Sequence, residues 1–177
     1  MKMMSFLLLG AVLMAATPKP NSGDYFLVYG SMENLQWSDG SMLDAPNTWC
    51  VVSTPEDEIY IAFKANEDGE YEFNLPVGQV YTMTFGGKDY VNKKVEIDAR
   101  KLEATKKGLT LKLDMLLFKA PEDVDVSAFE QPVAKFMYEE SYRKLVPDME
   151  YIEDNMRDFE KAMRKIEKES LRADSGK

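Results

Sequence analysis

The chain has 177 residues, 45% of them hydrophobic and 11% aromatic, which is enough for one domain with its own core and argues against disorder throughout. Its formal net charge of −9 at pH 7 argues against nucleic-acid partners and anionic membrane surfaces, since both require clustered Lys and Arg. Histidine is absent, which removes the commonest general base and metal ligand, and the single cysteine, Cys50, excludes an intramolecular disulfide.

The first 24 residues have the pattern of an export signal followed by a linker. Lys2 precedes a nearly unbroken apolar run, Met3–Ala16, whose roughly 14 residues fall short of the about 20 that span a bilayer. We therefore expect a signal peptide at residues 1–16 and a linker at residues 17–24. The remaining protein is then expected to be exported, periplasmic or outer-membrane-associated, with no membrane span after cleavage.

Short runs rich in aromatic and β-branched residues recur between turn signals, which is typical of an all-β sandwich. We expect strands at residues 25–30, 49–53, 58–65, 91–97, 109–118 and 133–138. Residues 31–48 are expected to form a long loop, with a short edge strand within it as the alternative. Cys50 is expected to be buried strand filler, with a reactive or intermolecular thiol as the alternative. In the connecting loop at 121–132, we expect Val124, Val126 and Phe129 to pack onto the sandwich.

The most regular stretch is residues 68–85. Asp68-Gly69 suits a tight hairpin turn, because Gly accepts positive φ without a steric penalty. Two strands of period two follow, separated by a Pro and Gly break at residues 76–78. Their expected buried faces are Tyr71, Phe73 and Leu75 in the first strand and Tyr81, Met83 and Phe85 in the second.

Residues 148–171 change to a helical period. Asp148 is a suitable N-cap, and apolar residues then recur at spacings of three and four. This seam consists of Met149, Ile152, Met156, Phe159, Met163 and Ile166. It either docks on the chain's own sandwich or pairs with another helix or chain; membrane insertion is disfavoured because the polar face carries both signs of charge. Residues from Leu171 onward are expected to fray.

Two tryptophans and two acidic clusters are the other candidates for a site. Trp37 is expected either to fill the core or to stand exposed as a recognition residue. The acidic cluster at residues 66–70 lacks the spacing of a calcium loop and is expected to be a solvated hairpin turn. The cluster at residues 122–125 could donate oxygens to Ca²⁺, but a solvated loop is the favoured interpretation. With no histidine and no nucleophile or phosphate-loop motif, the sequence predicts no metal, no cofactor and no enzyme.

Residues 67–90 resemble the carboxypeptidase regulatory-like domain. The resemblance rests on Asp68-Gly69-Glu70-Tyr71, Leu75-Pro76-Val77-Gly78, Tyr81-Thr82-Met83 and Lys88-Asp89-Tyr90, with Asp89 where that family usually has Gly. It implies a transthyretin-like (prealbumin-like), seven-stranded β-sandwich, which with its extension covers residues 25–138. Residues 115–151 are similar to an uncharacterised extension found behind such domains in secreted proteins of Gram-negative envelopes, so we expect a C-terminal amphipathic helical unit at 139–177.

These patterns together predict a non-catalytic secreted or periplasmic protein-binding module, or an assembly subunit of the cell envelope. Its contacts are expected to use the sandwich loops or edge and the helical seam, with an envelope protein or a second copy as partner. The alternative is a small-ligand or glycan-binding sandwich in which Trp37 and Trp49 stack on the ligand.

Overall fold

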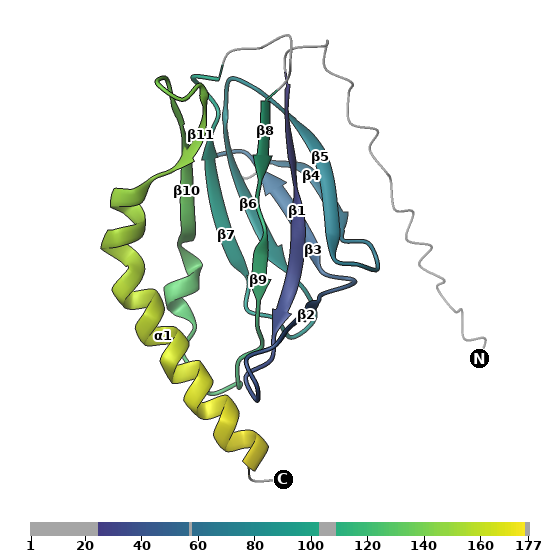
Figure 1. Ribbon diagram of the computed structural model, residues 1–177, viewed down its shortest axis with the longest axis vertical. Coiled ribbons are helices and arrows are strands. Elements are labelled where there is room, and N and C mark those ends of the chain that lie inside the picture. The colour runs from purple at the N-terminus through teal and green to yellow at the C-terminus, as the bar shows by residue number, and fades with distance from the viewer. Residues whose placement is uncertain (1–24, 57, 103–108, 176–177) are drawn as a thin grey trace, which may run out of the picture.

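The structure is a computed structural model that describes residues 25–56, 58–102 and 109–175. The predicted signal peptide at 1–16 and linker at 17–24 lie outside the described residues. Two β-sheets face each other, and a single long helix lies along one side and one end of them (Figure 1). Among the described residues, no helix is both long enough and apolar enough to cross a membrane.

The first sheet is organised around one long strand, β1 (Tyr25–Leu35). β5 (Glu70–Pro76) pairs antiparallel with its first half, and β2 (Met42–Asp44) with its last residues. β8 (Leu109–Lys112) and β9 (Met115–Leu117) pair with β1 in parallel, one after the other. The residues expected to be a long loop therefore contain the second half of β1, which was not predicted, and the short edge strand β2, which was the alternative for this region.

The second sheet has six strands, and most of its neighbours are antiparallel. Their order is β11 (Lys144–Pro147), β10 (Pro132–Glu139), β7 (Lys93–Asp98), β6 (Val80–Gly86), β3 (Trp49–Ser53) and β4 (Ile59–Lys64). β7 and β10 are the parallel pair. β11 falls within the residues that the sequence assigned to the helical unit, because four residues are too few to show a strand period.

The main core lies between the two sheets and follows the predicted alternation. The alternate residues of β5 and β6 are buried as expected: Tyr71, Phe73, Leu75, Tyr81, Met83 and Phe85. Burying each such side chain stabilises the fold by about 1.5–3 kcal/mol. The predicted class, a mainly β sandwich followed by an amphipathic C-terminal helix, is confirmed, with eleven strands among the described residues in place of the seven expected.

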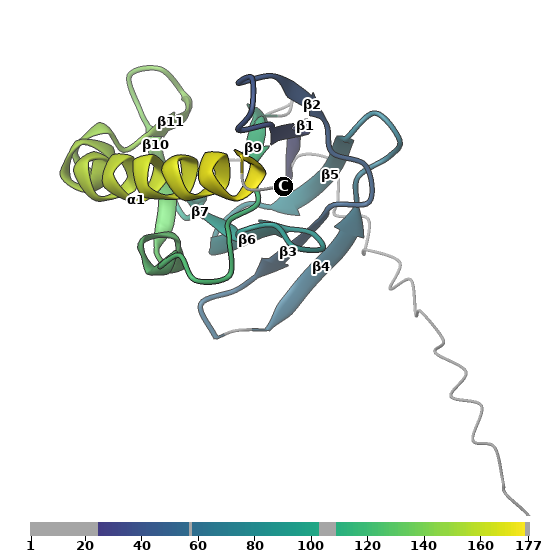
Figure 2. The same cartoon turned by 90° about the horizontal axis from the view of Figure 1, so that it is seen from below.

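The helix α1 (Met149–Ser175) begins at the predicted cap. The Asp148 carboxylate accepts a hydrogen bond from the backbone N–H of Tyr151 at 3.0 Å, and the Asp148 N–H donates to the Lys135 carbonyl of β10 at 2.8 Å. From this anchor α1 runs beside β10 and then past the end of the sandwich where β9 and β2 lie (Figures 1 and 2). It continues beyond Leu171, where fraying was expected, and an Arg172–Glu169 ion pair at 2.8 Å lies in its last turns.

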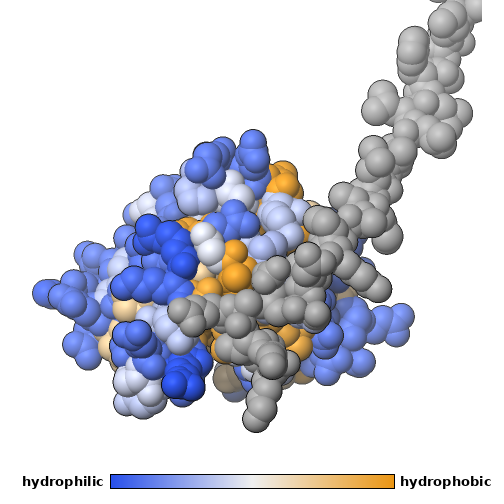
Figure 3. All heavy atoms as spheres, turned by 90° about the horizontal axis from the view of Figure 1, so that it is seen from above, coloured by the Kyte–Doolittle hydropathy of each residue, from blue (hydrophilic) through white to orange (hydrophobic). Residues whose placement is uncertain are grey.

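The opposite end of the sandwich, where β1 begins, has a mixed surface. Viewed from above, hydrophobic residues gather near the middle of this end and are surrounded by hydrophilic residues (Figure 3). The helix α1 lies across only one of the two ends of the sandwich, the end near β9 and β2 (Figures 1 and 2).

The turn before β5 depends on Gly69, as the sequence predicted. Gly69 has φ of 75°, and its carbonyl accepts a hydrogen bond from the Met32 N–H at 2.8 Å. A Cβ at this position would lie 2.5 Å from the Met32 carbonyl oxygen, which is backbone and cannot move aside cheaply. Gly78 also has positive φ, 93°, but a Cβ there meets no atom within 4 Å.

We predict that Gly69→Ala destabilises the protein by about 2–4 kcal/mol, through backbone strain plus a steric clash. Gly78→Ala is the matched control and is expected to lower the free energy of unfolding by only about 1 kcal/mol, because it adds backbone strain without a steric clash. Urea unfolding of the two variants measures both costs, and equal values would contradict this account of the turn.

Candidate functional site

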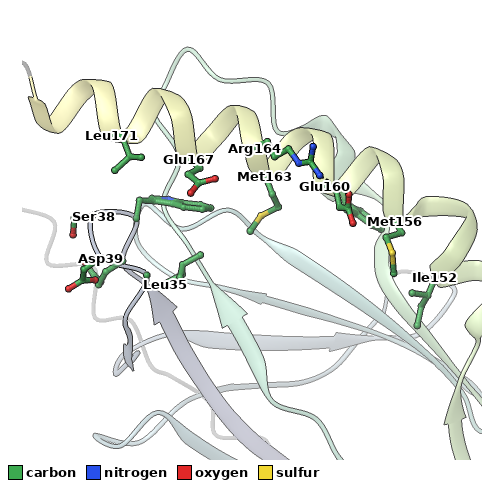
Figure 4. Close-up of a pocket in the computed structure, with 14 residues that line it drawn as sticks. Leu35, Ser38, Asp39, Ile152, Met156, Glu160, Met163, Arg164, Glu167 and Leu171 are labelled. Atoms are coloured by element: carbon green, nitrogen blue, oxygen red, sulfur yellow. Dashed lines mark hydrogen bonds and ion pairs between the residues drawn. The ribbon is translucent and has the colours of Figure 1, made fainter.

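An open groove of about 770 Å³ lies between α1 and the hairpin that joins β1 to β2 (Figure 4). Its apolar lining comes from both walls: Leu35 and Trp37 from the hairpin, and Ile152, Met156, Phe159, Met163 and Leu171 from the helix. Charged residues also line it, Asp39 on the hairpin side and Glu160, Arg164 and Glu167 on the helix side. The groove therefore has apolar side chains on two elements that are far apart in sequence.

The hairpin wall is a tight turn held by its own backbone. The Gln36 N–H donates to the Ser41 carbonyl at 2.9 Å, and the Gly40 N–H donates to the Gln36 carbonyl at 2.9 Å. The Ser41 N–H also donates to the Asp39 carboxylate at 2.9 Å. These hydrogen bonds from Ser41 hold the pKa of Asp39 below its usual range, so this carboxylate stays ionised on the rim of the groove.

Trp37 joins the hairpin wall to the interior. Its indole Nε1–H donates to the Lys119 carbonyl at 2.8 Å, and its ring meets Phe118 edge to face with centroids 5.5 Å apart. The side chain is only partly buried, and it lines the groove as well. Trp37 therefore combines the two roles that the sequence left open, since it packs inward and also presents surface to the groove.

A satellite core fixes the helix wall. It consists of Val91, Phe118, Val124, Phe129 and Ile166, with Trp37, Phe159, Ala162 and Met163 among the partly buried residues packed against it. Phe159 stacks on Phe129 with centroids 5.7 Å apart, and Ile166 is fully buried. Phe129 belongs to a 3-10 helix, η1 (Ser127–Glu130), in the loop that was expected to pack onto the sandwich. The second half of α1 thus docks on the chain's own sandwich.

The six residues of the predicted seam divide between the satellite core and the groove. Ile166 is buried inside, and Phe159 and Met163 contact the satellite core while lining the groove. Ile152 and Met156 line the groove, and Met156 is 45% exposed. Met149 is exposed in the first turn, outside the groove lining. A partner can therefore reach only part of the seam.

Trp49 lies apart from Trp37. It is part of β3 and pairs with Lys64 on one side and Gly86 on the other. Its ring packs against Gly86 so closely that a Cβ at Gly86 would lie 2.6 Å from the Trp49 Cζ2 atom. The two tryptophans have different neighbours, so the structure does not bring them together as one stacking site.

The two acidic clusters form turns. In the first, the Asn66 side-chain oxygen accepts hydrogen bonds from the N–H groups of Asp68 and Glu70 at 3.1 and 2.7 Å. In the second, the Asp125 carboxylate accepts a hydrogen bond at 3.0 Å from the N–H of Ser127, the first residue of η1. Across the described residues, no three carboxylates, cysteines or histidines gather in a geometry that fits a metal ion.

Cys50 is fully buried in β3. Burial raises the pKa of its thiol, which keeps it protonated and therefore unreactive. This position fits the strand-filler interpretation.

The sequence did not predict the groove itself. Leu171 was expected to fray, and Leu35 and Glu167 were not singled out, yet all three line it. Met163, Glu167 and Leu171 follow one another at spacings of four, so helical period marks their shared face. The hairpin wall has no comparable signal, because its distance from α1 in sequence is more than a hundred residues.

One basic side chain is enclosed beside the satellite core. Lys93 of β7 donates to the Leu116 carbonyl at 2.5 Å, and its Nζ lies 4.5 Å from the centre of the Phe118 ring. Burial lowers the pKa of Lys93 to about 8, because the charged ammonium loses its hydration there. At Lys93 the unfolded chain therefore binds more protons than the folded chain between about pH 8 and 10.5.

We predict that the native protein becomes more stable relative to Lys93→Met as the pH rises from 8 to 10.5. Because the pKa of Lys93 is lower in the folded than in the unfolded chain, the folded protein loses this proton first as the pH rises. The free energy of unfolding then increases with pH, by at most about 1.4 kcal/mol per pH unit. Urea unfolding at several pH values measures the difference, in which the titration of Cys50 and the tyrosines cancels. Lys64→Met, an exposed site on β4, is the control, and a Lys93→Met difference that is flat across this range would refute the prediction.

The fold and the groove together define a β-sandwich domain whose docked C-terminal helix forms one wall of a surface groove. No model of a protein family and no curated protein sequence matches the chain. Solved structures with partial likeness include the Bacillus anthracis TIE protein, at 19% identity and a TM-score of 0.39 over 54% of this chain and 18% of that one.

Two dioxygenases show a similar degree of likeness. The 3-chlorocatechol 1,2-dioxygenase of Rhodococcus opacus 1CP matches at 11% identity and a TM-score of 0.38, over 58% of this chain and 62% of that one. The dioxygenase domain of a dioxygenase and carbohydrate-binding fusion from Streptomyces sp. SirexAA-E matches at 9% identity and a TM-score of 0.39, over 61% and 86%. The chain thus spans less than two thirds of the first two of these three structures.

The prediction that this chain is not an enzyme is corrected, because the solved structures that resemble it include dioxygenases. The absence of histidine excludes imidazole chemistry only; tyrosine, lysine and carboxylate side chains still serve as ligands and proton carriers in enzymes. At TM-scores of 0.36–0.39 the likeness assigns no activity to this chain.

Proposed function

We propose that this chain is an exported protein-binding module or assembly subunit of the cell envelope, and that it binds a segment of its partner in the groove between α1 and the first hairpin. The observation that carries the proposal is the division of the seam. Ile166 and Phe159 hold the helix in place, while Met156 and Ile152 remain available in the groove. Apolar surface that is gathered in one place marks an interaction site, and here Ile152, Met156 and Leu171 lie along one groove together with Trp37.

The chemistry of the walls supports a protein partner. Methionine is flexible and polarisable, so Met156 and Met163 adapt to the shape of a partner side chain. Trp37 adds a large aromatic surface held by its hydrogen bond to Lys119, which is the type of residue that contributes most to binding energy at interfaces. The export pattern of residues 1–16 and the resemblance to the carboxypeptidase regulatory-like domain, with its envelope extension, support the compartment and the scaffold role.

A small-ligand or glycan-binding module is the second candidate function. It is favoured by one observation, that the volume of the groove, about 770 Å³, falls within the range of about 300–1,000 Å³ typical of small-molecule sites. In this version Trp37 is the stacking residue and Trp49 takes no part, because Trp49 packs against Gly86 on β3.

We predict that Met156→Lys reduces recovery of the partner at least about tenfold in pull-downs from crosslinked envelope extracts, because a charge in the apolar groove costs more than 1.4 kcal/mol of binding. Met137→Lys is the matched control, since Met137 is also 45% exposed but lies on β10 outside the groove lining. Both variants should retain the thermal unfolding of the native protein, since neither side chain is buried.

Undiminished partner recovery with Met156→Lys would refute the groove as the binding site. Loss of recovery with both variants would point to a surface other than the groove. Quenching of Trp37 fluorescence by a glycan panel, with no loss of a protein partner, would favour the second candidate function.

A further inference from the structure

The charged residues on the rim of the groove indicate the charge of the partner, which the apolar lining does not. Of the four charged residues that line it, Glu160 and Arg164 pair with each other at 3.3 Å. Within the part of the chain that the structure describes, no basic side chain lies within ion-pair distance of Asp39 or Glu167. Two uncompensated negative charges therefore remain, one on each wall.

These two carboxylates are placed on opposite sides of the apolar lining. Asp39 belongs to the hairpin turn and Glu167 to the helix, and Figure 4 shows both beside the groove, with Leu171 near the same end. The hydrogen bond from the Ser41 N–H fixes the Asp39 carboxylate in position. A segment that enters the groove thus passes between two negative charges, one on each wall.

We propose that the occupant of the groove is an extended segment of a partner protein in which large apolar residues are accompanied by lysine or arginine. This inference rests on the proposed function and adds the chemistry of the partner to it. The apolar residues enter the lining around Met156, Met163 and Trp37, and the basic residues pair with Asp39 and Glu167. An acidic segment would meet repulsion from both walls and from a chain whose net charge is −9.

The length of the helix wall sets the length of the segment. At about 1.5 Å per residue, the helix from Ile152 to Leu171 is about 28 Å long. An extended chain rises about 3.3 Å per residue, so about nine residues fill this length.

The test uses the whole chain and two labelled peptides of about nine residues. Leucine and phenylalanine alternate with lysine in one peptide and with glutamate in the other, so that the apolar positions are identical. Fluorescence anisotropy at low salt measures both affinities. We expect the lysine peptide to bind at least about tenfold more tightly, and its affinity to fall as salt is added.

The double variant Asp39→Asn/Glu167→Gln tests whether the rim carries this preference. We expect it to weaken binding of the lysine peptide about three- to tenfold. Glu58→Gln/Glu72→Gln is the matched control, because it removes the same charge from exposed sites on or beside other strands and should leave the affinity unchanged. Met156→Lys should abolish binding of the lysine peptide.

Equal binding of the two peptides, failure of the lysine peptide to bind, or an equal loss with the rim and control variants would each overturn the inference. In the envelope pull-down, loss of the partner with Met156→Lys but full recovery with the rim variant would also overturn it, while the proposed function would stand. Full recovery with Met156→Lys would instead refute the proposed function.

Discussion

The burial of Ile166 and the stacking of Phe159 on Phe129 are the contacts on which the rest of this structure depends. A helix of 27 residues with alternating charges on its outer face has little reason to stay helical at a fixed place unless part of it leaves water. The satellite core supplies that burial at the end of the sandwich, away from the main core between the sheets. Its position decides where α1 lies.

The groove follows from this docking. Phe118 lies at the junction, since it belongs to the satellite core and also meets the ring of Trp37 edge to face. The same side chain therefore holds the hairpin and, through its neighbours, the helix. Because both walls are fixed to one small cluster, their separation does not depend on a partner. A preformed apolar groove of this kind binds with a smaller loss of conformational entropy than one that must assemble.

Enclosing Lys93 in this cluster has an energetic cost. Its ammonium lies over the Phe118 ring and donates to the Leu116 carbonyl. Among the residues that the structure describes, no carboxylate forms an ion pair with it that would compensate the hydration it loses. The link between the sandwich and the helix is therefore less stable than its aromatic contacts alone would make it. The contribution of Lys93 to stability should rise at alkaline pH, whereas burial raises the pKa values of Cys50 and Tyr81 in the main core and gives them the opposite dependence.

The parts of the structure that the sequence predicted are those set by local period. Tyr71, Phe73 and Leu75 alternate with polar residues and are buried, and Asp148 caps the helix as its type and position indicated. The second half of β1 was missed because polar residues and Gly30 interrupt its period. Local sequence gave no sign that Trp37 and Met163 would face the same groove, because this depends on a long-range contact between a hairpin and a helix.

The sequence also could not decide between docking and pairing of the helical seam. Both arrangements need the same apolar spacing. Docking of Phe159 depends on where the fold places Phe129, and the spacing of the seam does not show this. The exposed Met156 shows that one seam serves an internal contact and still leaves apolar surface in the groove. Spacing alone does not show which residues of the seam pack inside and which face the groove.

The central claim is that α1 is docked on its own sandwich through the satellite core before any partner binds. Nuclear Overhauser contacts between the Phe129 and Phe159 rings, in protein with selectively labelled phenylalanine, measure this directly. The account predicts these contacts in the isolated protein, together with the same rotational correlation time for α1 and for the strands. Absence of the contacts, with faster independent motion of α1, would contradict it.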